Sequence, residues 1–279
     1  MSDHDHHDGD LPDHDRGLSH DLPRLLSRRR ALAILGVGAG GLALAACGAD
    51  EVTGSGATTG PAAAATSSAA ASGAEIPAET GGPFPADGSN GVNVLTESGV
   101  VRRDITRSFG AAAGVAGGVP LTVTLKVVDV QDGAAPLAGA AVYLWQCDRD
   151  GNYSLYSPGV TDQNYLRGVQ ETGTDGAATF TSIYPAAYPG RWPHIHFEVY
   201  ESLAAATAAA GKLRTTQLAL PEDVSRQVYA TSGYEQSVRN LARTSLGSDL
   251  VFRDGYSLQL ATVTGSVGSG LTATLTVPV

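Results

Sequence analysis

The feature that most limits the fold of this chain is a series of short segments in which apolar and polar residues alternate. In residues 121–130 every second residue from Leu121 to Val127 is Leu or Val, and those between are Thr or Lys. A period of two is typical of a strand with one buried and one solvated face. Further strands are expected at residues 139–147, 178–183, 194–200, 215–220, 257–264 and 271–277. Many short strands at regular spacing predict a mainly β fold, a β-sandwich of mixed and antiparallel strands with short helices and long loops.

The segments between these strands carry turn and helix patterns. Thr174-Asp175-Gly176 predicts the turn of a hairpin over residues 172–183. Residues 203–211 are rich in Ala and predict one short helix, and residues 221–230 and 235–243 predict two more. Residues 79–91 are dense in Gly, Pro, Asp and Asn, which predicts a loop, and its role is left open.

Two histidines stand together in one of the expected strands. His194 and His196 flank Ile195, so both imidazoles should point to one face of a half-buried strand. The other five of the seven histidines lie in the first twenty residues, at His4, His6, His7, His14 and His20. Side-by-side ring nitrogens suit adjacent positions on one metal ion, and a solvated pair on an exposed strand is the alternative.

The N-terminal region has the pattern of an export signal. Three arginines, Arg28 to Arg30, precede a short apolar run that ends at Cys47. The arginines resemble a twin-arginine signal, and Leu44-Ala45-Ala46-Cys47 resembles a bacterial lipobox. We therefore expect residues 1–46 to be an export signal, Cys47 to carry a lipid that anchors the protein to a membrane outside the cytoplasm, and residues 47–74 to be a flexible tether. Residues 75–279 would form the folded domain.

Charge and cysteine content exclude two classes of protein. The formal net charge is -10, which argues against a phosphate-backbone partner such as a nucleic acid. Only Cys47 and Cys147 are present, so no disulfide framework is available. Cys147 falls in a strand pattern and is expected to be a small buried hydrophobe. The stability of the domain must therefore come from packing and, in one interpretation, from a bound metal.

Two tyrosines extend the candidate metal site. Tyr188 lies six residues before His194 in a loop marked by Pro and Gly, and Tyr153 follows the strand at residues 139–147. Phenolate oxygen suits a hard cation such as ferric iron, whereas zinc and ferrous sites more often include carboxylate or thiolate. From spacing alone, ordinary core or loop tyrosines are the favoured interpretation.

Several motifs in a fixed order resemble the intradiol ring-cleavage dioxygenases, the family of catechol and protocatechuate dioxygenases. They are Pro136-Leu137-Ala138-Gly139-Ala140, Leu144-Trp145-Gln146-Cys147-Asp148 leading to Gly151-Asn152-Tyr153-Ser154, Asn164-Tyr165-Leu166-Arg167-Gly168, Tyr184-Pro185 with Tyr188-Pro189, and Arg191-Trp192-Pro193-His194-Ile195-His196-Phe197. The resemblance runs from about residue 82 to residue 220. One departure is Trp192-Pro193, which stands where the family usually has Pro-Ala, so the role of Trp192 is left open.

The resemblance implies a set of roles. Tyr153, Tyr188, His194 and His196 would bind Fe(III), and Tyr188 would also act as a base. Arg191 would stabilise negative charge on the substrate, and Gln217 corresponds more weakly to a glutamine near the metal. The implied reaction is cleavage of a catechol-type diol with O2 to a muconate-type diacid. Neither the ring substituents of the substrate nor the oligomeric state follows from the sequence.

Two other interpretations stay open at this point. His194, His196 and Glu198 share one face of the expected strand and would make a site of two histidines and a carboxylate. However, three same-face residues of one strand rarely surround a single ion, because the strand carries the third residue too far along. The other interpretation is a lipid-anchored binding protein whose metal site is structural or vestigial.

Overall fold

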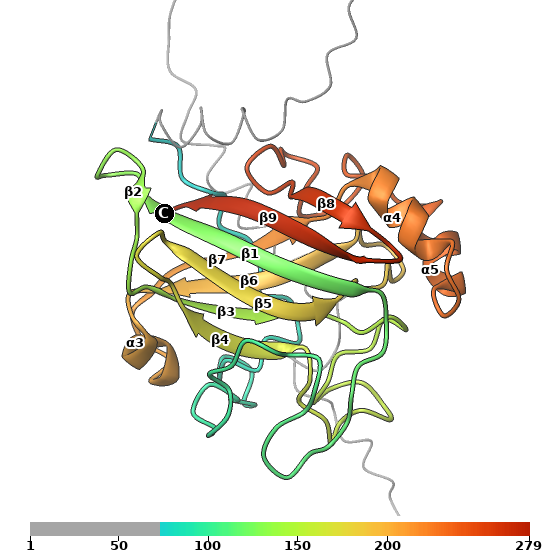
Figure 1. Ribbon diagram of the computed structural model, residues 1–279, viewed down its shortest axis with the longest axis horizontal. Helices are drawn as coiled ribbons and strands as arrows, with labels where there is room; N and C mark the ends of the chain where they lie inside the picture. Colours follow the sequence, from blue (N-terminus) through green and yellow to red (C-terminus); the bar gives the residue numbers. More distant parts are fainter. Residues whose placement is uncertain (1–72) are drawn as a thin grey trace, which may run out of the picture. The chain divides into compact units, whose positions relative to one another are not determined.

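The computed structural model describes residues 73–279. In this part the chain forms two β-sheets that pack face to face (Figure 1). One sheet contains β1 (Pro120–Asp129), β2 (Ala135–Pro136), β5 (Ala177–Ile183), β8 (Thr262–Ser266) and β9 (Gly270–Pro278). The other contains β3 (Ala141–Trp145), β4 (Arg167–Glu171), β6 (His194–Tyr200) and β7 (Lys212–Ala219). The predicted β-sandwich is confirmed. The predicted export signal, Cys47 and all but the last two residues of the predicted tether lie outside the described residues.

Strand pairing is mixed in the first sheet and antiparallel in the second. β9 lies between β1 and β8, parallel to β1 and antiparallel to β8. β5 and β2 both pair antiparallel with β1. The order β4-β3-β6-β7 of the second sheet places β6 between two hydrogen-bonded neighbours, because β3 and β7 pair with it on either side. The strand that carries the histidine pair is therefore a central one.

The space between the sheets is filled by the alternating apolar residues. Burial of such side chains is the main favourable term in folding, at roughly 25 cal/mol per Å² of apolar surface. The larger contributors from the strands are Leu121, Val123, Leu125, Val127, Val142, Leu144, Phe180, Ile195, Phe197, Val199, Leu271, Leu275 and Val277. Trp192 belongs to the same core, and its indole N–H donates to the carbonyl of Leu220 at 2.8 Å. Trp192 therefore packs in the sandwich interior.

The strand β6 differs from its expected half-buried form, since all seven of its residues are buried. Its odd-numbered side chains face the interior of the sandwich. Its even-numbered side chains lie on the outer face of the second sheet, where Tyr143 and Trp145 pack in a second cluster with residues 86–100. The alternation was interpreted correctly, but loops rather than solvent cover the polar face.

Three short helices occupy the ends of the sandwich. They are α3 (Leu203–Thr207), α4 (Glu222–Tyr229) and α5 (Glu235–Leu241), with α3 at one end and the other two together at the opposite end (Figure 1). All three predicted helices are confirmed, each somewhat shorter than expected. The hydroxyl of Ser202 accepts from the N–H of Ala205 and caps α3. None of the helices in residues 73–279 has the length and apolar character needed to cross a bilayer.

Two expectations about strands are wrong. The segments on either side of the turn at residues 173–177 do not form a hairpin, because β4 joins the second sheet and β5 joins the first. The local pattern shows a turn but cannot show to which sheet each strand belongs. The strand expected at residues 257–264 begins only at Thr262, since residues 257–259 form a turn. The strand β4 was not predicted.

The segment before the first strand connects both sheets and reaches the histidine pair. The N–H of Ile76 donates to the carbonyl of Pro278 at the end of β9, and the N–H of Glu79 donates to the carbonyl of Thr215 in β7, both at 2.8 Å. This course brings Gly82 over the outer face of β6. The predicted loop at residues 79–91 is confirmed, and its first part lies against His196.

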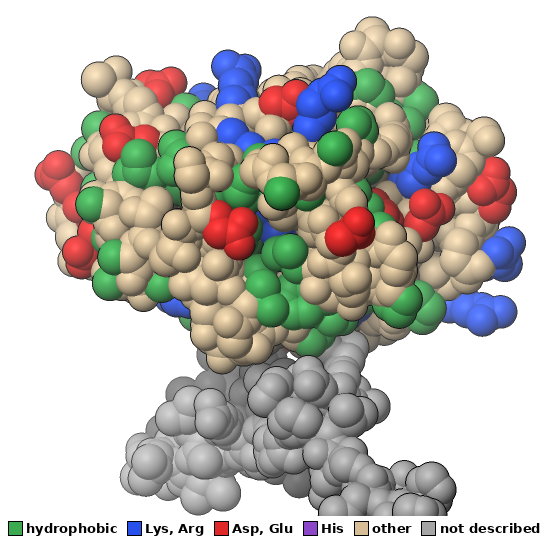
Figure 2. All heavy atoms as spheres, turned by 90° about the horizontal axis from the view of Figure 1, so that it is seen from below, with side chains coloured by type: hydrophobic (Ala, Val, Ile, Leu, Met, Phe, Trp, Pro, Cys, Tyr) green, Lys and Arg blue, Asp and Glu red, His purple; other side chains and the backbone are tan. Residues whose placement is uncertain are grey.

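The surface agrees with the burial of the candidate site. On the face drawn in Figure 2, basic and acidic side chains are interspersed, and no histidine side chain is visible. His194 and His196 are 2% and 3% exposed. The alternative of a solvated histidine pair is therefore wrong.

Candidate metal centre

The four predicted metal ligands converge on the outer face of the second sheet. His194 and His196 come from the same face of β6, Tyr153 from the loop after β3, and Tyr188 from the loop between β5 and β6. The hydroxyl oxygen of Tyr188 lies 3.1 Å from Nε2 of His194 and 3.5 Å from the hydroxyl oxygen of Tyr153. The two Nε2 atoms lie 3.1 Å apart. Two phenols and two imidazoles therefore direct their polar atoms at one point.

The imidazole of His194 is oriented by the backbone. Its Nδ1 lies 2.5 Å from the carbonyl oxygen of Trp192, and because a carbonyl can only accept, Nδ1 carries the proton. The lone pair is then on Nε2, which has Tyr188 and His196 at 3.1 Å and Nη1 of Arg191 at 3.4 Å. One lone pair cannot accept from three donors. This crowding suits a shared cation better than a set of hydrogen bonds.

The imidazole of His196 is held by packing. It stacks on Trp145 with ring centroids 5.0 Å apart and planes 10° from parallel, and Tyr153 meets its edge at 6.2 Å. Its Nδ1 has no hydrogen-bond partner among residues 73–279. Gly82 has φ +72°, and a Cβ there would lie 3.4 Å from Cε1 of His196. The positive φ therefore favours glycine where this loop passes the ring, and an added Cβ would touch the ring.

Burial determines the charge state of the four groups. Burial and the charge of Arg191 lower the pKa of His194, and burial and His194 lower the pKa of His196, in both cases well below the usual range. Burial and the neighbouring Tyr188 raise the pKa of Tyr153 well above its ordinary value. Burial also raises the pKa of Tyr188, but the charge of Arg191 opposes this rise. Tyr188 is therefore the phenol more readily ionised, and a cation would favour ionisation of both.

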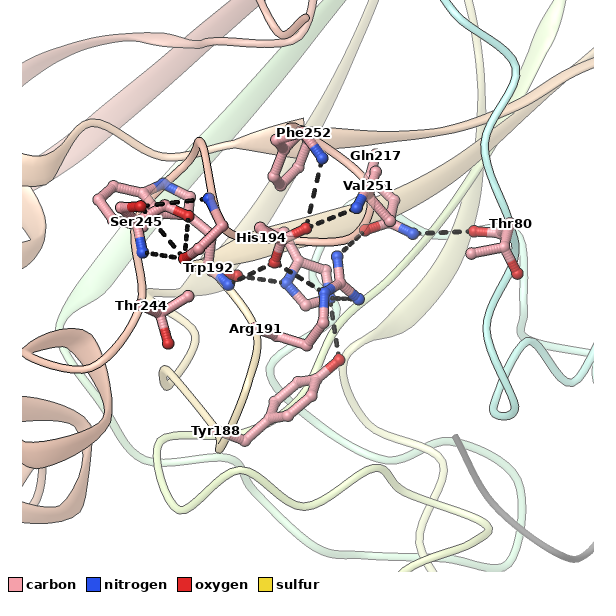
Figure 3. Close-up of polar contacts among 12 residues, drawn as sticks. Thr80, Tyr188, Arg191, Trp192, His194, Gln217, Thr244, Ser245, Val251 and Phe252 are labelled. Carbon is pink, nitrogen blue, oxygen red and sulfur yellow. Dashed lines mark hydrogen bonds and ion pairs between the residues drawn. The ribbon is translucent and has the colours of Figure 1, made fainter. Parts of the chain in front are cut away.

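A buried arginine lies beside the histidines and makes three directed contacts (Figure 3). The Nε–H of Arg191 donates to the carboxylate of Asp249 at 2.9 Å, and Nη2 donates to Oε1 of Gln217 at 2.5 Å. The side-chain amide of Gln217 in turn donates to the carbonyl of Thr80 at 2.9 Å. The remaining nitrogen, Nη1, faces His194. The predicted neighbours Arg191 and Gln217 are thus brought together with the histidine pair.

The residues present fit a hard metal ion. Two ligands about 2.1 Å from one ion and at a right angle to each other are about 3 Å apart, close to the separations observed among the four polar atoms. No group of three or more His, Cys, Asp or Glu side chains in residues 73–279 is arranged to hold a metal. Within the described residues, the phenols of Tyr153 and Tyr188 lie where they could complete a site with the two imidazoles, and anionic oxygen favours ferric iron.

The alternative site of two histidines and Glu198 is not supported. The carboxylate of Glu198 accepts from the hydroxyl of Tyr200 at 2.6 Å and from Nζ of Lys212 at 2.7 Å. These partners hold the carboxylate one pleat farther along β6 than His196.

Sequence reasoning missed Asp249, which is fully buried against Arg191. It lies 58 positions after Arg191, in a loop without a regular pattern. The available indication was general: an arginine expected inside a domain needs acceptors for its N–H groups, and a carboxylate is one such acceptor. The region holds several acids, so that rule could not select this one.

Comparison with known proteins gives three findings. A protein-family model described as "Dioxygenase" matches residues 96–232, which include Tyr153, Tyr188, Arg191, His194 and His196. The chain is 43% identical over 53 residues to chlorocatechol 1,2-dioxygenase of Rhodococcus opacus, covering 19% of this chain and 21% of that protein. It is 36% identical over 108 residues to 6-chlorohydroxyquinol 1,2-dioxygenase of Cupriavidus pinatubonensis, covering 31% of this chain and 38% of that protein. These matches support the intradiol dioxygenase family.

A solved structure extends this result to the fold. The intradiol ring-cleavage dioxygenase from Tetranychus urticae superposes with a TM-score of 0.53 and 26% identity, covering 65% of this chain and 87% of that chain. By contrast, the chain spans well under half the length of the curated relatives it matches. Family and fold are thus supported together, and the activity is treated below as a proposal.

Proposed function

We propose that this protein is an intradiol ring-cleavage dioxygenase that binds Fe(III) through Tyr153, Tyr188, His194 and His196. Its substrates would be a catechol-type diol and O2, and its product a muconate-type diacid. The observation that carries the proposal is the convergence of two buried phenols and two buried imidazoles beside a buried arginine. The matches to chlorocatechol and chlorohydroxyquinol dioxygenases support the choice of an aromatic diol.

The protein side chains have distinct tasks in this reaction. Bound Fe(III) would supply a Lewis acid for the two diol oxygens and would draw electron density from the ring. Tyr188 accepts a diol proton at its hydroxyl oxygen, because a phenolate is a base and Arg191 favours ionisation of this phenol more strongly than that of Tyr153. Tyr153 is held by its contacts with His196 and Phe84.

Arg191 stabilises the negative charge that develops on the substrate during cleavage. The guanidinium is 4% exposed, so its charge acts where water screens little. Asp249 and Gln217 hold two of its nitrogens, and Nη1 is left facing the polar atoms of the site. A fixed donor of this kind needs no reorganisation as charge develops.

The test is turnover by the full 279-residue chain loaded with iron. We expect O2 consumption and diacid formation with catechol, hydroxyquinol or chlorocatechol. Arg191→Gln should lower kcat by roughly 100-fold or more, the size of effect seen when one stabilising donor is removed. Tyr256→Phe changes a half-exposed tyrosine outside the site and should leave the rate unchanged.

The result also separates the enzyme from a binding protein. Iron bound by Tyr153 and Tyr188 without turnover of any of these diols would support a structural or vestigial site. Turnover that survives Arg191→Gln unchanged would contradict the role given to the arginine.

A further inference from the structure

The carboxylate of Asp249, which is not one of the four predicted metal ligands, supports the candidate site through hydrogen bonds. Asp249 is 0% exposed and lies in the loop between α5 and β8. Its Oδ1 accepts from the backbone N–H groups of Val251 at 2.8 Å and Phe252 at 3.4 Å. Its own loop therefore fixes the orientation of the carboxylate and directs Oδ2 towards the segment that precedes β6.

The second oxygen reaches two groups of that segment. Oδ2 accepts from Nε of Arg191 at 2.9 Å and from the backbone N–H of Trp192 at 2.7 Å. A guanidinium is planar, so a contact at Nε together with the contact of Nη2 with Gln217 fixes the whole plane. Nη1 then has one direction left, towards His194 at 3.4 Å.

The same oxygen also reaches the first histidine through one residue. The backbone N–H of Trp192 donates a hydrogen bond to Asp249. The carbonyl oxygen of Trp192 accepts a hydrogen bond from Nδ1–H of His194 at 2.5 Å. The carboxylate thus holds the backbone unit that sets the tautomer and ring orientation of His194. Arg191 and His194, two groups with different tasks, depend on one oxygen atom.

We propose that Asp249 is a positioning residue for ring cleavage, and this proposal rests on the proposed function above. Asp249 fixes the guanidinium of Arg191 and, through Trp192, the imidazole of His194, without touching substrate. Residue 249 lies beyond the range 96–232 matched by the family model, so that match does not identify it.

The informative substitution is Asp249→Asn in the full chain. An amide has one acceptor oxygen, so it can serve the N–H groups of its own loop or those of Arg191 and Trp192, but not both pairs. Asp132→Asn is the matched control, because Asp132 is exposed in the turn between β1 and β2.

The first readout needs neither iron nor turnover. In the metal-free full chain, the Nε–H proton of Arg191 is followed by NMR and assigned by its loss in Arg191→Lys. We expect slow exchange with water in the wild type and in Asp132→Asn. In Asp249→Asn we expect exchange faster by roughly tenfold or more, because a protected buried hydrogen bond has been opened. An unchanged exchange rate overturns the proposal.

The second readout is kinetic. In the iron-loaded protein, Asp249→Asn should lower kcat by roughly 10- to 100-fold, with KM for catechol within about threefold, as expected for a misplaced catalytic group. The visible absorption of iron-bound tyrosinate should persist, which shows that the ligands remain in place. In an Arg191→Lys background, Asp249→Asn should have a clearly smaller effect than alone, because both changes act on one network.

Other outcomes are also decisive. If the losses of kcat caused by Arg191→Lys and by Asp249→Asn multiply in the double variant as independent effects would, the proposal is overturned. Asp249→Glu keeps the charge and is the second variant if Asn does not fold. It should lower kcat less than Asn does, and an undiminished kcat contradicts the need for a fixed carboxylate. If the wild type turns over no diol, the proposed function fails, whereas the exchange measurement still decides whether Asp249 orients Arg191.

Discussion

Substitution of Arg167 by Met should destabilise the domain strongly. Arg167 is fully buried, and no salt bridge to Asp or Glu is found for it within residues 73–279. Instead, Nη1 donates to the carbonyls of Phe84 at 2.9 Å and Pro85 at 3.1 Å, and Nη2 donates to the carbonyl of Ser154 at 2.9 Å. Met has a similar volume but no donor, so the carbonyls of Phe84 and Ser154 lose their partner, whereas the carbonyl of Pro85 still accepts from the hydroxyl of Tyr143 at 2.7 Å.

The magnitude follows from the two carbonyls left without a partner. Each costs about 1–2 kcal/mol, and relief from burying a guanidinium offsets part of the sum, which leaves a net loss of about 2 kcal/mol. For a domain of this size that corresponds to a fall in Tm of roughly 4–8 °C. Urea unfolding of the full chain at pH 7 measures it, with Arg226→Met as control, because Arg226 is 60% exposed and pairs with the exposed Glu222. A loss below about 1 kcal/mol, or one no larger than that of the control, would refute the reasoning.

The remaining predictions concern the loop, pH and iron. Gly82→Ala and Gly159→Ala both place Cβ at positive φ and should each cost about 1–2 kcal/mol, but only Gly82→Ala should also disturb His196 and weaken the iron–tyrosinate absorption. Burial raises the pKa of Asp87, but hydrogen bonds from Ser89 and the charge of Lys212 together outweigh it, and the pKa is lowered. Its contribution, about 1 kcal/mol, is therefore present above about pH 4 and lost as pH falls through the folded pKa, so the stability gap to Asp87→Asn should narrow as pH falls below about 4, and a constant gap would contradict this. Iron should raise Tm, because it binds the native state, and a chelator should reverse the rise; equal Tm values would contradict binding.

The sequence predicted most strands for a physical reason. In β1 one face meets the core and the other meets solvent, so the alternation from Leu121 to Val127 reports burial directly. In β6 the same alternation was present, but the second face is covered by residues far away in the chain, beginning with Gly82. Local pattern gives the period of a strand, and tertiary packing decides what covers each face.

The residues of the candidate site differed in how well the sequence predicted them. The spacing of His194 and His196 gave the centre, and the resemblance to the intradiol dioxygenases gave Tyr153 and Tyr188. Neither could give Asp249, because an ion pair across 58 positions leaves no local pattern. The sheet assignment around residues 173–177 failed for a related reason, since a turn sequence is the same whether its strands pair or separate.

The most direct test of the account is the visible absorption spectrum of the full chain with Fe(III). Five histidines lie in residues 4–20, so bound iron alone could report another site, whereas a tyrosinate-to-iron band requires a phenolate ligand. We predict a broad band that shifts when catechol is added, weakens in Tyr153→Phe and in Tyr188→Phe, and is unchanged in Tyr256→Phe. A colourless protein that does not respond to catechol, or a band that survives both site substitutions, would contradict the proposed iron centre.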